Sequence, residues 1–254
     1  MAKRDDACIP LFKNRFHAGH LLARRLVAYA AHQDVLVLAL PRGGVPLGYM
    51  VARALAVPLD ILMVRKLGLP SQPEYALGAV SGEEMCLLHR DKIQSSGTDM
   101  ATVHALIDRE KAELSRREIL YRAGKPALPL HNKIVILVDD GIATGSSMSV
   151  AIRVARRMKP AKIIVAVPVA PRASRKALAS IADEVICLHS PFPFTSVGEW
   201  YKDFRQVSDA VVMHLLEKHW TQVTRAKTGI PRHSDPCYPA ERGVALSSTN
   251  IPGP

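Results

Sequence analysis

VILVDDGIATGSS, residues 135–147, is the stretch of sequence that decides the fold. Its four leading apolar residues predict a buried strand, and two adjacent carboxylates, Asp139 and Asp140, follow directly. A turn of small and hydroxyl-bearing residues comes next, and apolar side chains then recur at helical spacing over 146–159. The stretch therefore predicts a strand, a turn and a helix, which is the local unit of an α/β protein.

The turn has the features of an anion site. Backbone N–H groups at the start of a helix lack intrahelical partners and bind anions. The hydroxyls of Thr144, Ser146 and Ser147 would lie beside these groups, and Gly145 would let the backbone approach a ligand closely. The two carboxylates would repel a phosphate, so we expect them to bind sugar hydroxyls or Mg²⁺. A ribose 5-phosphate satisfies both requirements.

Strands and helices alternate along the rest of the chain. Runs rich in Val, Ile and Leu predict strands at 35–40, 59–64, 133–138, 162–169 and 184–188. Helical patterns predict helices at 21–31, 45–56, 99–122, 146–159 and 172–182. We therefore expect an α/β fold with a mainly parallel sheet, helices on both faces, and ligands at the carboxyl ends of the strands.

Two stretches depart from this alternation. Residues 65–98 form a long connection with a candidate hairpin at 75–80 and 85–89, and connections of this length are usually functional lids or disordered. From His219 onward the chain carries five prolines and no helical or strand period. We therefore predict a disordered tail over 219–254.

Composition limits the class of protein. The 254 residues include 34 Lys and Arg against 23 Asp and Glu, which gives a net charge of +11 and favours an anionic partner. The longest apolar run is too short for a membrane span and the N-terminus lacks a signal-peptide core, so we expect a soluble, cytoplasmic protein that does not bind membranes. The four cysteines have neither zinc nor disulfide spacing, so we expect reduced thiols.

The positive charge is concentrated. Residues 141–182 contain eight Lys and Arg and no acid. Arg153, Arg156 and Arg157 fall on the polar face of the predicted helix 146–159, away from the core. This face would either steer a polyanionic substrate through its field or bind nucleic acid, and we favour the former.

Residues 135–147 resemble the phosphoribosyl pyrophosphate (PRPP) signature of the type I phosphoribosyltransferases. Three further segments agree with the resemblance. LPRGG at 40–44 follows the first predicted strand, where the family has its pyrophosphate loop, and Arg65-Lys66 ends the second, where adenine-type members carry Arg-Lys. The connection 65–98 stands where the family has its mobile catalytic loop. The resemblance covers about residues 12–215 and is strongest to uncharacterised members with an LPRGG loop.

The resemblance implies a role for each matching residue. Asp139 and Asp140 would hold the ribose hydroxyls. The 5-phosphate would be held by Ala143, Thr144, Gly145, Ser146 and Ser147, and the pyrophosphate by Arg42, Gly43, Gly44, Arg65 and Lys66. The implied catalytic group is Asp139, Asp140, Lys66 and Glu74.

Two positions depart from the family pattern. Gly141 stands where the signature is usually apolar, which predicts a looser turn or a closer approach to the sugar. Ala143 stands where hypoxanthine-guanine-type members have an Asp, so the general base of those enzymes is absent. Among the carboxylates Glu74, Glu83 and Glu84 of the connection, we choose Glu74 as the candidate base.

The implied reaction is Mg²⁺-dependent transfer of phosphoribose from PRPP to a nitrogen acceptor, expected to be a nucleobase, with release of pyrophosphate. Substrate oxygens would hold most of the Mg²⁺ coordination, and Asp139 and Asp140 are the candidate protein ligands. We expect residues 1–218 to form this domain and to assemble as a homodimer. Two alternatives stay open: a non-catalytic regulator that senses PRPP or nucleotide and contacts nucleic acid, and a hydrolase acting on the same ligand.

Two features have no unique interpretation. Five of the thirteen aromatic residues lie from Phe192 to Phe204. Residues 190–205 would either form a hood whose aromatic rings stack on a planar acceptor or be a segment buried against the core. Asn14 and Arg15 precede the first predicted helix, where they could cap it or reach the site.

Overall fold

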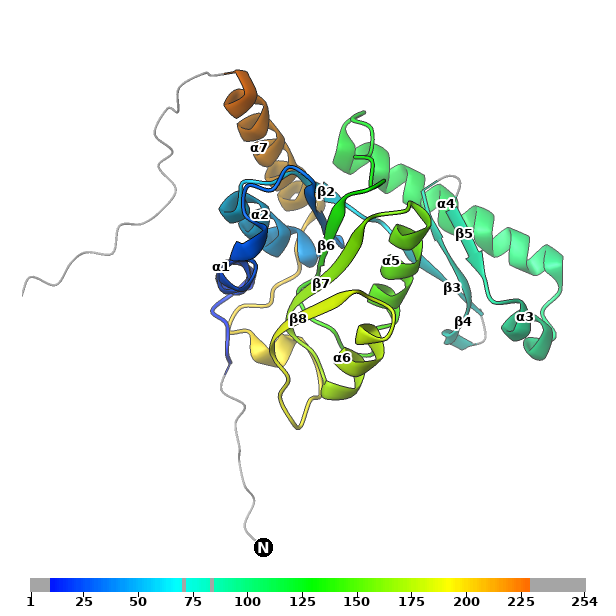
Figure 1. The fold of residues 1–254 in the computed structure, drawn as a ribbon. Helices are drawn as coiled ribbons and strands as arrows, with labels where there is room; N and C mark the ends of the chain where they lie inside the picture. The colour runs from blue at the N-terminus through cyan, green and yellow to red at the C-terminus, as the bar shows by residue number, and fades with distance from the viewer. Residues whose placement is uncertain (1–9, 70–71, 83–84, 229–254) are drawn as a thin grey trace, which may run out of the picture.

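A parallel sheet forms the centre of the protein (Figure 1). The computed structural model describes residues 10–69, 72–82 and 85–228, with side chains for all of these except 72–76 and 223–228. Five parallel strands are ordered β2-β1-β6-β7-β8, and their bounds are β1 Val35–Ala39, β2 Leu59–Ile61, β6 Ile134–Val138, β7 Lys162–Val169 and β8 Glu184–His189. The predicted α/β class and parallel sheet are confirmed.

Helices cover both faces of this sheet, and for that reason its strands are predominantly apolar. In β6, Ile136 and Val138 face one core while Val135 and Leu137 face the other. The first core packs against α1 (Arg15–Arg25), α2 (Gly44–Leu55) and α7 (Asp209–Thr228), and the second against α5 (Ser146–Arg157) and α6 (Arg172–Ala179). Figure 1 shows the two groups of helices on opposite sides of the sheet.

The long connection folds into a second, smaller unit at one end of the molecule (Figure 1). Its antiparallel sheet contains β3 (Arg65–Leu69), β4 (Gln72–Ser81) and β5 (Met85–Leu88). Two helices follow, α3 (Arg90–Ser96) and α4 (Met100–Arg122). The predicted hairpin is confirmed by the pairing of β4 with β5. The predicted second strand is too long, because β2 ends at Ile61 and Arg65-Lys66 opens β3 instead.

The first helix lies upstream of its predicted position. It covers Arg15–Arg25 rather than 21–31, because the side chain of Asn14 caps it by accepting a hydrogen bond from the backbone N–H of His17 at 2.9 Å. A short 3₁₀ turn, η1 (Val27–Tyr29), occupies half of the remaining predicted span, 26–31.

The predicted tail boundary at residue 219 is also wrong. The helix α7 continues to Thr228. His219 is buried, and its Nε2 lies 3.1 Å from the carbonyl oxygen of Val57. Trp220 Nε1 donates to the carbonyl oxygen of Leu59 at 2.9 Å. The remaining predicted tail, 229–254, lies outside the described residues. No helix in the described part of the chain is both long and apolar enough to cross a membrane.

Candidate functional site

Two loops meet at the carboxyl ends of β1 and β6. The backbone N–H of Leu40 donates to the carbonyl oxygen of Val138 at 2.9 Å, which brings LPRGG beside the two carboxylates. A Cβ atom on Gly43 would lie 2.1 Å from Asp140 Oδ2, and one on Gly44 would lie 2.5 Å from the Val138 oxygen. The two glycines therefore permit this approach, and the Pro41–Arg42 peptide bond before them is cis.

Arg15 is the residue of this site to which the sequence assigned no role. Its Nε and Nη2 both lie 2.8 Å from Asp140 Oδ2. Its Nη1 donates to the carbonyl oxygen of Arg205 at 2.8 Å, and its guanidinium lies 3.8 Å from the ring centroid of Phe204. Arg15 shares the buried face of α1 with Ala18 and Leu22. An arginine at a core-facing position requires a buried partner, and this signal could have identified it from the sequence.

Burial changes the acidity of the two signature carboxylates. It raises the pKa of Asp139 well above its ordinary value, and the charge of Asp140 adds to the effect. Burial also raises the pKa of Asp140, against the charge and hydrogen bonds of Arg15. Asp139 Oδ1 accepts a hydrogen bond from the Asp140 backbone N–H at 2.8 Å. A ligand that brings hydroxyl donors or positive charge would therefore stabilise the ionised pair.

The turn after the carboxylates begins α5, as the sequence predicts. Gly145 has a φ of +79°, a conformation that glycine adopts readily. The hydroxyl oxygens of Thr144 and Ser146 lie 3.0 Å apart, and the backbone carbonyl of Ala143 accepts a hydrogen bond from Ser174 of α6 at 2.6 Å. The first turn of α5 and these hydroxyls form the anion-binding geometry expected of a phosphate loop.

Gly141 packs closely against another segment of the chain, whereas the sequence predicts a looser turn or a closer approach to the sugar. A Cβ atom there would lie 2.4 Å from Cγ1 of Val197. The turn therefore approaches the segment 190–205, and this packing explains the glycine.

Two arginines of the predicted pyrophosphate site each lie beside an acid. A cavity of about 240 Å³ is lined by residues that include Pro41, Arg65, Asp139 and Ser147. Arg65 forms an ion pair with Glu110 of α4. In the LPRGG loop, Arg42 lies 3.6 Å from Asp209 at the start of α7. The structure thus brings Arg65 to the carboxylate and the phosphate turn, whereas Arg42 and Lys66 are outside the lining of this cavity.

The candidate general base is only partly described. Glu74 belongs to β4, but its side chain lies outside the described part of the structure, and so do Glu83 and Glu84. The assignment of the base stays a prediction.

The aromatic segment contributes more to packing than to an open stacking wall. Trp200, in the 3₁₀ turn η2 (Gly198–Trp200), and Tyr201 are buried, whereas Phe192 is 94% exposed. The hydroxyl of Tyr201 donates to the backbone carbonyl of Asp140 at 2.5 Å, and its ring centroid lies 4.9 Å from that of Phe204. These contacts hold the segment against the signature loop.

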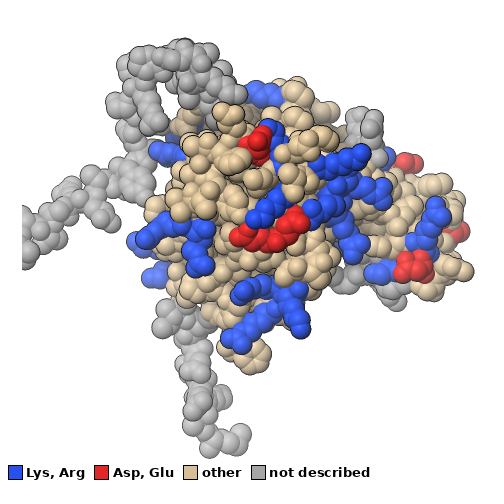
Figure 2. Space-filling model, viewed as in Figure 1, with Lys and Arg blue, Asp and Glu red and all other residues tan. Residues whose placement is uncertain are grey.

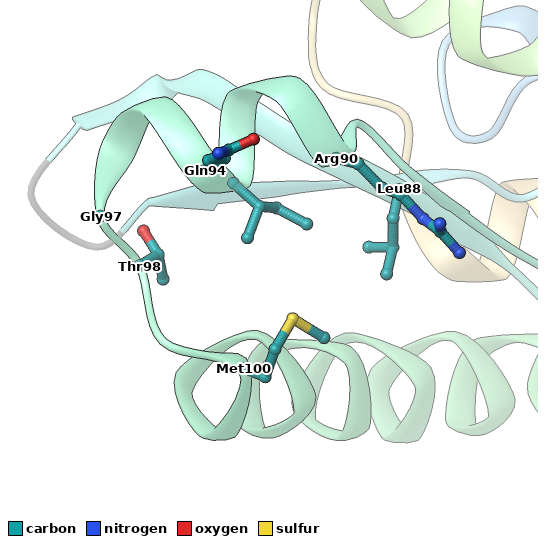
Figure 3. Close-up of a pocket in the computed structure, with 7 residues that line it drawn as sticks. Leu88, Arg90, Gln94, Gly97, Thr98 and Met100 are labelled. Carbon is teal, nitrogen blue, oxygen red and sulfur yellow. The ribbon is translucent and has the colours of Figure 1, made fainter.

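A larger cavity of about 610 Å³ lies elsewhere, between β5, α3 and the start of α4 (Figure 3). Its lining is Leu88, Arg90, Ile93, Gln94, Gly97, Thr98 and Met100. It shares no residue with the carboxylate cavity and its lining contains no acid or histidine, so it has no group suited to acid–base chemistry.

The protein itself offers few metal ligands. Across residues 10–69, 72–82 and 85–228, no group of three or more His, Cys, Asp or Glu side chains is arranged to hold a metal ion. Asp140 is already paired with Arg15, so Asp139 is the better placed of the two carboxylates for a cation.

The fold is that of an α/β protein whose candidate ligand site lies at the carboxyl edge of a parallel sheet. Residues 13–202 match the family model of the phosphoribosyl transferase domain. The chain is 42% identical over 208 residues to Rv0571c of Mycobacterium tuberculosis H37Rv, which is provisionally named a phosphoribosyl transferase, and MT0597 of strain CDC 1551 matches equally. These matches cover 82% of this chain but 47% of either relative, so the chain spans about half their length.

A solved structure shares the fold over most of this chain. TT1426 from Thermus thermophilus is 38% identical with a TM-score of 0.74, and the match covers 82% of this chain and 98% of that one. The chain belongs to the type I phosphoribosyltransferase family.

Proposed function

We propose that this chain transfers phosphoribose from PRPP to a nitrogen acceptor, with a nucleobase as the expected acceptor, and releases pyrophosphate. The observation that carries the proposal is the meeting of Asp139 and Asp140 with the LPRGG loop at one sheet edge, directly before the phosphate turn. Nucleotide metabolism, a cytoplasmic location and a homodimer are parts of the same proposal.

Positioning and charge account for the rate of such a reaction. Asp139 and Asp140 would hold the ribose hydroxyls while the turn 143–147 holds the 5-phosphate. The bond from C1 to pyrophosphate breaks as the acceptor nitrogen bonds to C1, and Glu74 would take the acceptor proton. Arg42, Arg65, Lys66 and the Gly43–Gly44 backbone would stabilise the departing pyrophosphate. The small unit of β3–β5 would exclude water, which would otherwise trap the positively charged sugar.

Mg²⁺ fits this site as an ion carried mainly by the substrate. The described chain supplies two adjacent carboxylates and no larger ligand cluster. Asp139 would hold the ion on the protein side. When bound, Mg²⁺ would neutralise charge on the diphosphate.

A pyrophosphate-release assay tests the proposal. The full chain is incubated with PRPP, Mg²⁺ and a panel of purines, pyrimidines and small amines, and we expect release that depends on one acceptor. Asp139→Asn combined with Asp140→Asn serves as the control. Loss of the charge-assisted hydrogen bonds should reduce PRPP affinity by roughly two to four orders of magnitude.

Three outcomes would contradict the proposal. Tight PRPP binding without release for any acceptor would identify a sensing protein. Release without an acceptor would identify a hydrolase. Normal turnover by the double variant would show that the site is assigned to the wrong residues.

A further inference from the structure

Arg117 lies in the wall of the carboxylate cavity, although its helix is far from the signature in sequence. It belongs to α4, and it lines the cavity of about 240 Å³ together with Arg65, Asp139 and Ser147. Two guanidinium groups from different elements thus border the space beside the phosphate turn. This arrangement is suited to a ligand with more than one phosphate group.

The ion pair of Arg117 leaves donors for such a ligand. Arg117 Nε donates to Glu113 Oε1 at 2.6 Å, which uses one of the five N–H groups of the guanidinium. Arg117 is also close to Asp209, the partner of Arg42: a hydrogen bond from Tyr121 and the charges of Arg42 and Arg117 lower the pKa of Asp209. Arg117 therefore lines the cavity and also acts electrostatically on the acid that pairs with Arg42 of the LPRGG loop.

The neighbouring Arg116 provides a built-in comparison. It binds the same carboxylate, with Nε 2.9 Å from Glu113 Oε2 and Nη2 3.1 Å from Oε1. Its side chain is 60% exposed against 34% for Arg117, and it is absent from the cavity lining. The two residues share a partner and a helix but differ in access to the cavity.

We propose that Arg117 binds the pyrophosphate group of the substrate, together with Arg65. The inference rests on the proposed function and adds a cation from outside the signature, the LPRGG loop and the Arg65-Lys66 pair. In the ligand-bound site, the terminal nitrogens of Arg117 donate to phosphate oxygens, while Glu113 keeps the guanidinium oriented.

Calorimetric titration of matched variants tests this role. Inorganic pyrophosphate, PRPP and ribose 5-phosphate are titrated, with Mg²⁺, into the wild type, Arg117→Gln and Arg116→Gln. Arg117→Gln should weaken pyrophosphate and PRPP binding at least about tenfold, the effect of losing a charge-assisted contact. It should leave ribose 5-phosphate affinity unchanged, because that ligand lacks the pyrophosphate. Arg116→Gln should change none of the three by more than about twofold.

The outcomes separate this inference from the proposed function. Two results would overturn the role of Arg117. One is an equal effect of Arg116→Gln and Arg117→Gln, and the other is an equal loss of affinity for all three ligands in Arg117→Gln. Pyrophosphate binding that depends on Arg117, in a protein that shows no transfer, would contradict the transferase alone. A wild type that binds neither pyrophosphate nor PRPP would contradict both. If Arg117→Gln fails to fold, Arg117→Lys is used, which keeps the charge and should weaken pyrophosphate binding less.

Discussion

Asp140 shares its carboxylate between the ligand site and a buried arginine. Arg15 binds Oδ2 through two nitrogens and, at the same time, binds the backbone at Arg205. The charge of Arg15 favours the ionised form of a carboxyl whose pKa burial raises. Arg15 thus acts as a positioning residue, because it fixes both the place and the charge of Asp140 without belonging to the signature.

Replacement of Arg15 should change the pH dependence of ligand binding. Arg15→Gln removes the charge that opposes burial, so the pKa values of Asp139 and Asp140 should rise further. In the proposed site, PRPP binds the ionised pair. The acid limb of its binding profile should therefore move to higher pH, and its affinity at pH 7 should fall about tenfold or more.

PRPP titrations across a pH series measure this shift. Arg15→Lys retains the charge and should shift the acid limb less than Arg15→Gln. An Arg15→Gln profile that overlays the wild type would mean that Arg15 contributes only to packing against Phe204.

Among the elements, the middle of α7 is held in the core by a histidine. Burial lowers the pKa of His219 to about 4, from an ordinary value of 6.5. The unfolded chain therefore binds a proton at mildly acidic pH that the folded chain excludes, so folding stability falls as the pH drops from about 6.5 to about 4. Between pH 7 and pH 5, this single group should lower the free energy of unfolding by about 2 kcal/mol.

Denaturant unfolding of His219→Gln measures that contribution. The variant lacks the titrating group. Between pH 7 and pH 5, the fall in its free energy of unfolding should therefore be smaller than that of the wild type by about 2 kcal/mol. His214→Gln is the matched control, because His214 lies on the same helix and is exposed. A wild type and a His219→Gln variant with the same pH dependence would contradict the buried, neutral state of His219.

The regular elements were the most predictable part of the fold. Continuous apolar runs identified all five parallel strands, because strands covered on both faces carry few polar side chains. Element ends were less predictable, since they depend on individual contacts: the Asn14 cap moved the first helix upstream. The helix α7 was not among the predicted helices, and its residues from His219 onward were assigned to the tail, although Trp220 binds the backbone of Leu59.

The site was predictable where its residues are close in sequence. The signature and the LPRGG loop were recognisable because backbone turns and glycines leave local patterns. Arg15 was left without an assigned role and Arg117 was missed, because each reaches the site through tertiary packing of a helix. The dense mixed charge of residues 99–122 is typical of a solvated face. The sequence pattern therefore did not distinguish Arg117, which borders a cavity, from the solvent-facing arginines of α4.

At the scale of the whole molecule, charge is unevenly distributed. Figure 2 shows Lys and Arg side chains in several groups on one face, with fewer acidic side chains among them. Arg153 and Arg157 of α5 are exposed, as the helical pattern predicts. Arg156 is also exposed but forms an ion pair with Asp183 at 2.9 Å.

This distribution predicts salt-dependent association. The exposed arginines of α5 should attract a polyanionic ligand before contact, so the association rate of PRPP should fall steeply with ionic strength. Arg153→Gln combined with Arg157→Gln should lower the association rate severalfold and leave the dissociation rate unchanged, as measured by stopped flow. Retention of the protein on nucleic acid at physiological salt, lost in the same variant, would instead support a nucleic-acid partner.

The ion pairs around the site have a consequence for the protein before it meets a ligand. Arg42 is paired with Asp209, Arg65 with Glu110 and Arg117 with Glu113. These acids act as internal counter-ions, which let mutually repelling guanidinium groups converge during folding. An arriving polyphosphate would compete with Asp209 for Arg42 and with Glu110 for Arg65, while Glu113 keeps the guanidinium of Arg117 oriented. The helices that carry the two displaced acids, α7 and α4, would therefore respond to ligand binding.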